Sequence, residues 1–173
     1  AACPAGVKFE HAVWMFNRVL EILAYVHKEH GIVHGAITPA HIVVFASDAQ
    51  TDPRNHGAKL LDWSYSVPIG EKLKAISPAY KDFYPPEVFA KQPVGPGLDI
   101  YMAAKSIEYV LGMTDNKLPL TVPFYLNNFL RGTRIPSTVM RPSNARELRE
   151  EFKEVMDANY GPKKYHRFDM PKA

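Results

Sequence analysis

The sequence contains a single cysteine, Cys3, among 173 residues. One cysteine excludes an internal disulfide framework and any metal site built on several cysteines, and it is typical of proteins from reducing compartments. There is also no apolar run approaching the ~20 residues that a membrane-spanning helix needs, and no signal-peptide pattern at the start. We therefore expect a cytoplasmic protein without a membrane span.

The chain has little net charge, and its excess lies at one end. Lys and Arg total 21 against 18 Asp and Glu, a formal charge of +3. Because a neutral body lacks the basic face of nucleic-acid binders, we expect no nucleic-acid partner. The basic tail at residues 161–173 is either solvated, packed on the body, or a docking segment for an acidic partner or membrane surface. Its charged residues are Lys163, Lys164, Arg167, Asp169 and Lys172.

Composition and hydrophobic patterning predict one mainly helical domain. The chain is 46% hydrophobic and 23% charged, as in ordinary globular proteins. Apolar residues recur at helical spacing over residues 10–30, and Gly31 follows as a C-terminal cap. Further helices are expected over residues 98–111, 122–131 and 143–160. On the helices expected over residues 10–30 and 143–160, the residues that should face water are Asn17, Arg18, Glu21, Lys28, Glu147, Arg149, Glu150, Lys153 and Glu154.

A small β-hairpin and a proline-rich connection complete the expected body. Residues 42–45 and 58–63 are short, β-branched or apolar segments joined by a polar stretch, which favours a hairpin. Residues 64–97 contain six prolines, so no long element is expected there. We predict a flexible N-terminus at residues 1–8, a folded body at residues 9–160, and the tail.

Four of the seven histidines lie close together in the sequence: His27, His30, His34 and His41. The spacing of His30 and His34 would suit one face of a helix, but Gly31 and the β-branched residues after it end the helix between them. We therefore do not expect a histidine metal site.

Five short motifs follow one another in a specific order. This series resembles the large C-terminal lobe of the eukaryotic-type protein kinases, in the order and roughly the spacing of that family, over residues 9–160. The resemblance implies a mainly α fold with a small β-hairpin, that is, a protein kinase-like C-terminal lobe lacking the N-terminal lobe. The motifs are His34-Gly35-Ala36, Asp62-Trp63-Ser64, Tyr84-Pro85-Pro86-Glu87, Asp99-Ile100-Tyr101 and Arg141-Pro142-Ser143.

The positions that hold the lobe together in that family are present. The resemblance implies that His34 supports the catalytic loop beneath the metal-binding aspartate, and that Asp99 accepts hydrogen bonds from backbone N–H groups of that loop. It also implies that Glu87 forms a buried ion pair with Arg141. Because an unpaired buried charge costs several kcal/mol, the presence of both residues is coherent.

The positions that perform phosphoryl transfer are mostly absent. The family's catalytic aspartate falls at Ala36, whose methyl group cannot accept a proton. Gly35 replaces the arginine that couples the loop to a phosphorylated segment. Thr38 replaces the lysine that approaches the transferred phosphate, and His41 replaces the magnesium-binding asparagine. Only Asp62 remains of the metal- and cofactor-binding set, either as a retained ligand or as the capping carboxylate of a turn.

The resemblance therefore implies a catalytically inactive pseudokinase that acts as a regulatory or protein-binding module. No cofactor is expected for this piece, and Mg-ATP would bind only together with an N-terminal lobe. Because the sequence begins with Ala1 instead of Met and carries no Gly-rich loop before a strand lysine, we expect that lobe elsewhere in a longer chain.

Two alternatives stay open. His34-Gly35 and Asp62-Trp63 are also similar to small-molecule phosphotransferases of the aminoglycoside and choline kinase type. An active Ser/Thr protein kinase or phosphotransferase of unusual chemistry would then depend on His41 or a nearby group. An unrelated helical adaptor, in contrast, would leave Glu87 and Arg141 far apart.

Residues 64–86 are the expected switch segment of the lobe. Because Gly35 provides no arginine to pair with a phosphate, we expect no family-type activation by phosphorylation. The candidate phosphorylation sites in the segment are Tyr65, Ser66, Ser77, Tyr80 and Tyr84.

Overall fold

The computed structural model describes residues 6–45, 57–162 and 166. The expectations for Cys3, for the polar stretch that follows Phe45 and for most of the basic tail fall outside those residues. At the N-terminal end of the described chain, the backbone N–H of Val7 donates a hydrogen bond to the carbonyl of Val110 at 2.8 Å. Residue 7 is thus tied to the body.

The first helix, α1 (Phe9–His30), matches the expected span to within one residue. Its apolar residues recur at helical spacing, and those at the core face are almost fully buried. The helix ends at Gly31, which adopts a left-handed conformation with φ 62°. Glycine suits this position because it has no Cβ to crowd the following carbonyl.

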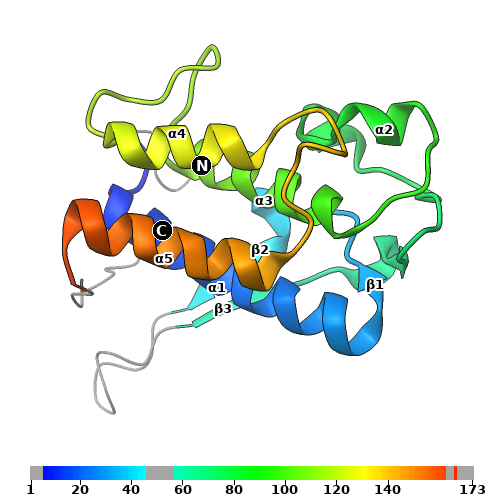
Figure 1. Ribbon diagram of the computed structural model, residues 1–173. Coiled ribbons are helices and arrows are strands. Elements are labelled where there is room, and N and C mark those ends of the chain that lie inside the picture. The colour runs from blue at the N-terminus through cyan, green and yellow to red at the C-terminus, as the bar shows by residue number, and fades with distance from the viewer. Residues whose placement is uncertain (1–5, 46–56, 163–165, 167–173) are drawn as a thin grey trace.

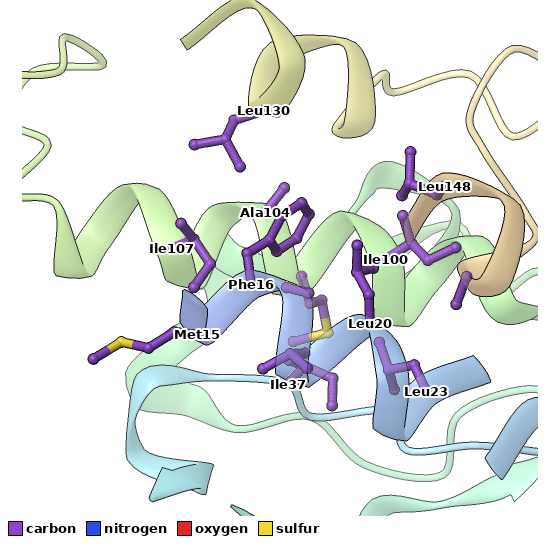
Figure 2. Close-up of a cluster of buried hydrophobic side chains, with 14 of the residues drawn as sticks. Met15, Phe16, Leu20, Leu23, Ile37, Ile100, Ala104, Ile107, Leu130 and Leu148 are labelled. Carbon is purple, nitrogen blue, oxygen red and sulfur yellow. The ribbon is translucent and has the colours of Figure 1, made fainter. Parts of the chain in front are cut away.

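The central helix, α3 (Pro96–Val110), packs against α1 and is hydrophobic on most sides. Figure 1 shows α3 in the middle of the molecule, between α4 on one side and α5 with α1 on the other. Buried apolar side chains from four helices and from the loop after β1 meet in one cluster (Figure 2). Because each fully buried Leu, Ile or Phe contributes about 1.5–3 kcal/mol, this cluster is the main source of stability. It includes Phe16, Leu20, Ile37, Ile100, Ala104, Ile107, Leu130 and Leu148.

Two further helices cover the core. Helix α4 (Phe124–Thr133) lies along α3, and α5 (Ala145–Tyr160) lies along α1 (Figure 1). Asn144 caps α5, because its side-chain oxygen accepts hydrogen bonds from the N–H groups of Arg146 and Glu147. The predicted helices over residues 98–111, 122–131 and 143–160 are therefore confirmed, with ends shifted by about two residues.

Part of the predicted solvent face of α1 and α5 is wrong. Arg149 of α5 donates a hydrogen bond from Nη2 to Glu21 of α1 at 2.9 Å, and the Arg149 side chain is only 19% exposed. Asn17 is also half-buried, and its Oδ1 is inaccessible to water. These residues lie at the seam between the two helices, where a charged side chain can bury its stem and pair its end group.

Two small antiparallel pairs of strands flank the helices. The predicted hairpin is present as β2 (Ile42–Phe45) paired with β3 (Gly57–Leu60). A second pair joins β1 (Ile32–Val33) to β4 (Val67–Pro68), strands that are far apart in the sequence. The described protein is thus mainly helical with small antiparallel sheets.

The segment from residue 64 to residue 95 contains only short elements, as its prolines predict. They are a 3₁₀ turn η2 (Trp63–Tyr65), the strand β4, a kinked 3₁₀ stretch η3 (Pro78–Phe83) and the one-turn helix α2 (Pro86–Phe89). Another 3₁₀ turn, η1 (Pro39–His41), precedes β2. No helix in the described part of the chain is long and apolar enough to cross a membrane.

Candidate functional site

Asp99, in the first turn of α3, holds the loop that follows β1. Its Oδ2 accepts a hydrogen bond from the backbone N–H of His34 at 2.7 Å, and its Oδ1 accepts one from the N–H of Gly35 at 2.9 Å. The Asp99 side chain is fully buried. The two N–H donors therefore replace the water that the carboxylate loses on folding. These are the contacts that the resemblance implies for this residue.

His27 of α1 is a third partner of Asp99, a contact that was not expected from the sequence. Its Nε2 lies 2.9 Å from Asp99 Oδ2, and its side chain is only 8% exposed. A signal was available, because His27 follows Leu20 and Leu23 at intervals of three and four residues, which extends the buried stripe of α1. A histidine on a buried stripe needs a polar partner from another element.

The His34 side chain fixes the loop from the inside. Its Nδ1 accepts a hydrogen bond from the Ala36 N–H at 3.3 Å, so the ring proton is assigned to Nε2, which donates to the Leu61 carbonyl at 3.0 Å. The ring also lies 4.4 Å from the Trp63 ring. Burial lowers the pKa of His34, against the opposing attraction of Asp99. The neutral ring therefore connects the loop to the end of β3.

Glu87 and Arg141 form the buried ion pair that the resemblance implies. Arg141 Nη1 and Nη2 donate to the two Glu87 carboxylate oxygens at 2.6 and 3.0 Å, and both side chains are at most 5% exposed. The Arg141 guanidinium also lies over the Tyr101 ring, 4.8 Å from its centroid. The pair connects α2 to the segment before α5, across 54 residues of sequence.

A second ion pair, buried only on the side of Glu108, was not expected from the sequence. Arg134 Nε donates to Glu108 Oε1 at 2.6 Å, and Glu108 is 1% exposed. Burial raises the pKa of Glu108, against the attraction of Arg134. Glu108 belongs to the buried helix α3, where a charged residue needs a partner from a neighbouring element. Here the end of α4 supplies it.

Gly35, Ala36 and Thr38 stand at positions that the resemblance assigns to phosphoryl transfer, and none of them carries a titratable side chain. Ala36 is fully buried, and so is Thr38. Gly35 has φ 75°, and a Cβ added there would lie 2.8 Å from the Tyr65 carbonyl oxygen and from a Leu73 methyl group. The backbone therefore excludes an arginine at residue 35 unless the loop moves.

His41 and Asp62 face each other at the mouth of this loop. His41 Nε2 lies 3.5 Å from Asp62 Oδ2, with side chains that are 15% and 42% exposed. Asp62 is also the N-cap of η2, because its Oδ1 accepts hydrogen bonds from the Ser64 hydroxyl and N–H. The hydrogen bonds from Ser64 lower the pKa of Asp62. One oxygen of Asp62 therefore caps a turn, and the other points to His41.

Asp62 adopts a left-handed backbone conformation, with φ 58° and ψ 69°. For a residue with a Cβ this conformation costs about 1–3 kcal/mol, and such residues concentrate at functional sites. In this left-handed turn, Oδ1 of Asp62 accepts a hydrogen bond from Ser64, and Oδ2 lies near His41.

Magnesium, the ion of the kinase family, does not fit this donor set. Magnesium prefers oxygen ligands in near-ideal octahedral geometry, whereas this site offers one carboxylate oxygen and one imidazole nitrogen. Within the described residues there is no group of three or more His, Cys, Asp or Glu side chains that could hold a metal ion.

One of the candidate phosphorylation sites is wrong. Tyr84 is 4% exposed, and its hydroxyl oxygen accepts a hydrogen bond from the Ser77 N–H at 3.0 Å. Burial raises the pKa of the Tyr84 hydroxyl. A kinase could not reach this hydroxyl without opening the segment before α2.

A scan of the sequence against models of protein families finds no match, and a search of the curated proteins finds none either. The contacts of the described residues are therefore the basis for the function proposed next.

Proposed function

We propose that the chain is the C-terminal lobe of a protein kinase-like fold and acts as a pseudokinase, a regulatory or protein-binding module without phosphoryl transfer. Two sets of contacts support the fold assignment. Asp99 holds the backbone of the loop at His34 and Gly35, and Glu87 pairs with Arg141. An unrelated adaptor has no reason to bring these residues together.

The observation that carries the functional proposal is the buried methyl group of Ala36. The loop around it is held in place by buried hydrogen bonds, yet residue 36 offers no group that accepts a proton from a substrate hydroxyl. The loss of a general base alone lowers a rate by about 10²- to 10⁴-fold. A loop that keeps its buried hydrogen bonds but lacks a general base is what we expect of a binding module.

We infer a protein as the partner and a reducing, cytoplasmic setting. The single cysteine and the neutral body support this assignment. Exposed apolar side chains outside the core, including Phe89, Leu120, Phe124 and Val139, provide surface on which a protein could pack.

A transfer assay on the full-length protein tests the proposal. The protein is incubated with Mg-ATP labelled at the γ-phosphate, once alone to detect autophosphorylation and once with a generic acceptor protein. We expect no incorporation above that of the Asp62→Ala variant, and no thermal stabilisation by Mg-ATP that Asp62→Ala removes. Robust transfer by the unmodified protein that Asp62→Ala abolishes would show that the chain belongs to an active enzyme.

The second candidate function is an active phosphotransferase that uses His41 as its base. The geometry of the His41 ring favours it, because Nδ1 lies 2.7 Å from the Ala36 carbonyl oxygen, which leaves Nε2 as the nitrogen beside Asp62. This alternative predicts transfer that His41→Ala abolishes and that His30→Ala, at an exposed histidine, leaves unchanged. Absence of transfer in the unmodified protein excludes it.

A further inference from the structure

Helices α1 and α5 enclose a cavity away from the loop after β1. Its volume is about 330 Å³, and its lining is mostly apolar. Val13 and Trp14 of α1 line one side, and Phe152, Met156 and Tyr160 of α5 line the other. The three residues of α5 recur every four positions, so they share one face of that helix. An apolar cavity of this size between helices is typical of a binding site.

The chain returns to this cavity after α5. His166 lines it, and His166 Nε2 lies 3.1 Å from the hydroxyl oxygen of Tyr160. The Tyr160 ring in turn packs edge-to-face on Phe9 of α1, with 5.2 Å between the ring centroids. The residues that follow His166 therefore start beside the cavity.

Those next residues alternate between charged and apolar: Arg167, Phe168, Asp169 and Met170. In an extended segment, Phe168 and Met170 would share one side and the two charged residues the other. Because an extended chain advances at most about 3.3–3.6 Å per residue, the Cα of Phe168 is within about 7 Å of that of His166. The segment is thus short enough and suitably patterned to place two apolar side chains in the cavity.

The charges around the cavity favour a segment with a basic residue. Arg149 and Lys153, which line it, already pair with glutamates at 2.9 and 3.0 Å. Glu10 and Asp157 also line it, and among the described residues neither has a Lys or Arg partner within ion-pair distance. Arg167 carries the positive charge that these carboxylates lack.

We propose that residues 167–170 of this chain dock into the cavity between α1 and α5, with the side chains of Phe168 and Met170 inside it. A cavity of about 150 Å³ holds one benzene ring, so a cavity of about 330 Å³ has room for a phenyl ring together with a methionine side chain. The inference uses none of the residues of the loop after β1, and it holds whether or not the chain is a pseudokinase.

Methyl NMR of the full chain, labelled with carbon-13 at the methionine methyl groups, tests the proposal. Met156 lines the cavity, and Met15, in the core cluster, is the internal reference for an intact fold. We expect nuclear Overhauser contacts between the Met156 methyl group and the Phe168 ring. We also expect Phe168→Leu, which keeps an apolar side chain but removes the ring current, to shift the Met156 methyl signal and leave that of Met15 in place.

Phe89→Leu is the matched control, because Phe89 is an exposed phenylalanine on α2 and its replacement should not move the Met156 signal. A Met156 signal that is unchanged in Phe168→Leu would show that the segment does not occupy the cavity, and the proposal would be wrong.

Dilution separates docking within one chain from exchange between two copies. A segment that docks on its own chain gives a Met156 methyl shift that is independent of protein concentration. A shift that changes with concentration would place the segment on a second copy and overturn the proposal.

Asp157→Asn tests the ionic part of the docking. We expect the ratio of docked to open chains, read from the Met156 shift relative to that in Phe168→Leu, to fall by about 1.5- to 5-fold, the range of an exposed ion pair. Glu154→Gln removes an exposed carboxylate from the same helix and should leave the ratio almost unchanged. Equal ratios in Asp157→Asn and the unmodified chain would overturn the charge pairing.

Discussion

Arg141 has five guanidinium N–H groups, and every one of them has an acceptor. Two donate to the Glu87 carboxylate, and the others donate to three backbone carbonyls. The acceptors on the backbone belong to Gly97, Ile135 and Pro136. A planar fork with five donors is specific to arginine, so lysine cannot reproduce this arrangement. The residue therefore holds the start of α3 and the segment before α5 against α2.

We predict that Arg141→Met lowers the free energy of unfolding by about 3–5 kcal/mol, because it leaves Glu87 buried without a partner. Urea denaturation followed by circular dichroism measures the change. Lys153→Met is the control, since Lys153 pairs with Glu150 at the surface and its removal should cost less than about 1 kcal/mol. A loss below about 1 kcal/mol in Arg141→Met would show that the pair is not a structural anchor.

His34 should make the stability depend on pH. Burial lowers its pKa below the ordinary value of 6.5, so the unfolded chain binds a proton at a higher pH than the native chain does. The free energy of unfolding is therefore fully retained above about pH 6.5 and falls on acidification below it, by at most about 1.4 kcal/mol per pH unit for one site.

We expect the slope of unfolding free energy against pH, between pH 5 and 7, to be smaller in His34→Gln than in the unmodified chain. Urea denaturation at several pH values measures both slopes. His30→Gln is the control, because that histidine is exposed and its replacement should leave the slope almost unchanged. Identical slopes in His34→Gln and the unmodified chain would mean that His34 is not the buried titrating group.

At the scale of elements, two glycines should respond in opposite directions to the same substitution. Gly31 has φ 62° at the end of α1, whereas Gly132 lies in α4 without a left-handed conformation, and a Cβ would meet nothing within 4 Å at either position. Only the backbone conformation therefore differs. We predict that Gly31→Ala destabilises the protein by about 1–2 kcal/mol, and that Gly132→Ala stabilises it by about 0.5–1 kcal/mol.

Thermal and urea unfolding of the two variants provide the comparison. A stabilising Gly31→Ala would mean that the chain leaves α1 by a different route than the left-handed turn. A destabilising Gly132→Ala would mean that the end of α4 is not helical. Each result bears on one element only.

The helices and the hairpin could be predicted from the sequence because their signals are local. The apolar periodicity of α1 and the glycine that ends it lie within one stretch of chain, as do the two strands of the β2–β3 hairpin. The pairing of β1 with β4 could not be predicted in this way. Each strand has two residues, and the register of Ile32 with Pro68 depends on tertiary packing.

The candidate site was predictable in its residue types but not in its contacts. Asp99, Glu87 and Arg141 were identified through the order of the motifs. The contact between His41 and Asp62 was not, because it requires the turn at η1 and the left-handed residue at η2 to bring two separate loops together. His27 was missed because it was considered as a metal ligand and not as a buried partner.

At the scale of the whole molecule, Asp99 connects α3 to the end of α1 and to the loop after β1, which lie 64 to 72 residues earlier in the sequence. It lies on α3 and contacts His27 of α1 together with the backbone of the loop after β1. Ala36 and Ile37 of this loop are fully buried, whereas the backbone N–H groups of His34 and Gly35 donate to the carboxylate. The order of the loop at residues 34 and 35 should therefore depend on this carboxylate.

We predict that Asp99→Asn loosens the loop before it loosens the core. His34 and Gly35 donate to different oxygens of Asp99, so the NH2 group of an amide would face one of the two N–H donors. Each lost hydrogen bond to a charged group costs about 1.5–3 kcal/mol. In native-state hydrogen exchange, the amides of His34 and Gly35 should exchange faster by local opening, while that of Ala103, in the buried middle of α3, keeps an exchange free energy equal to that of global unfolding. Equal loss of protection at all three amides would instead show that Asp99 supports the fold as a single cooperative unit.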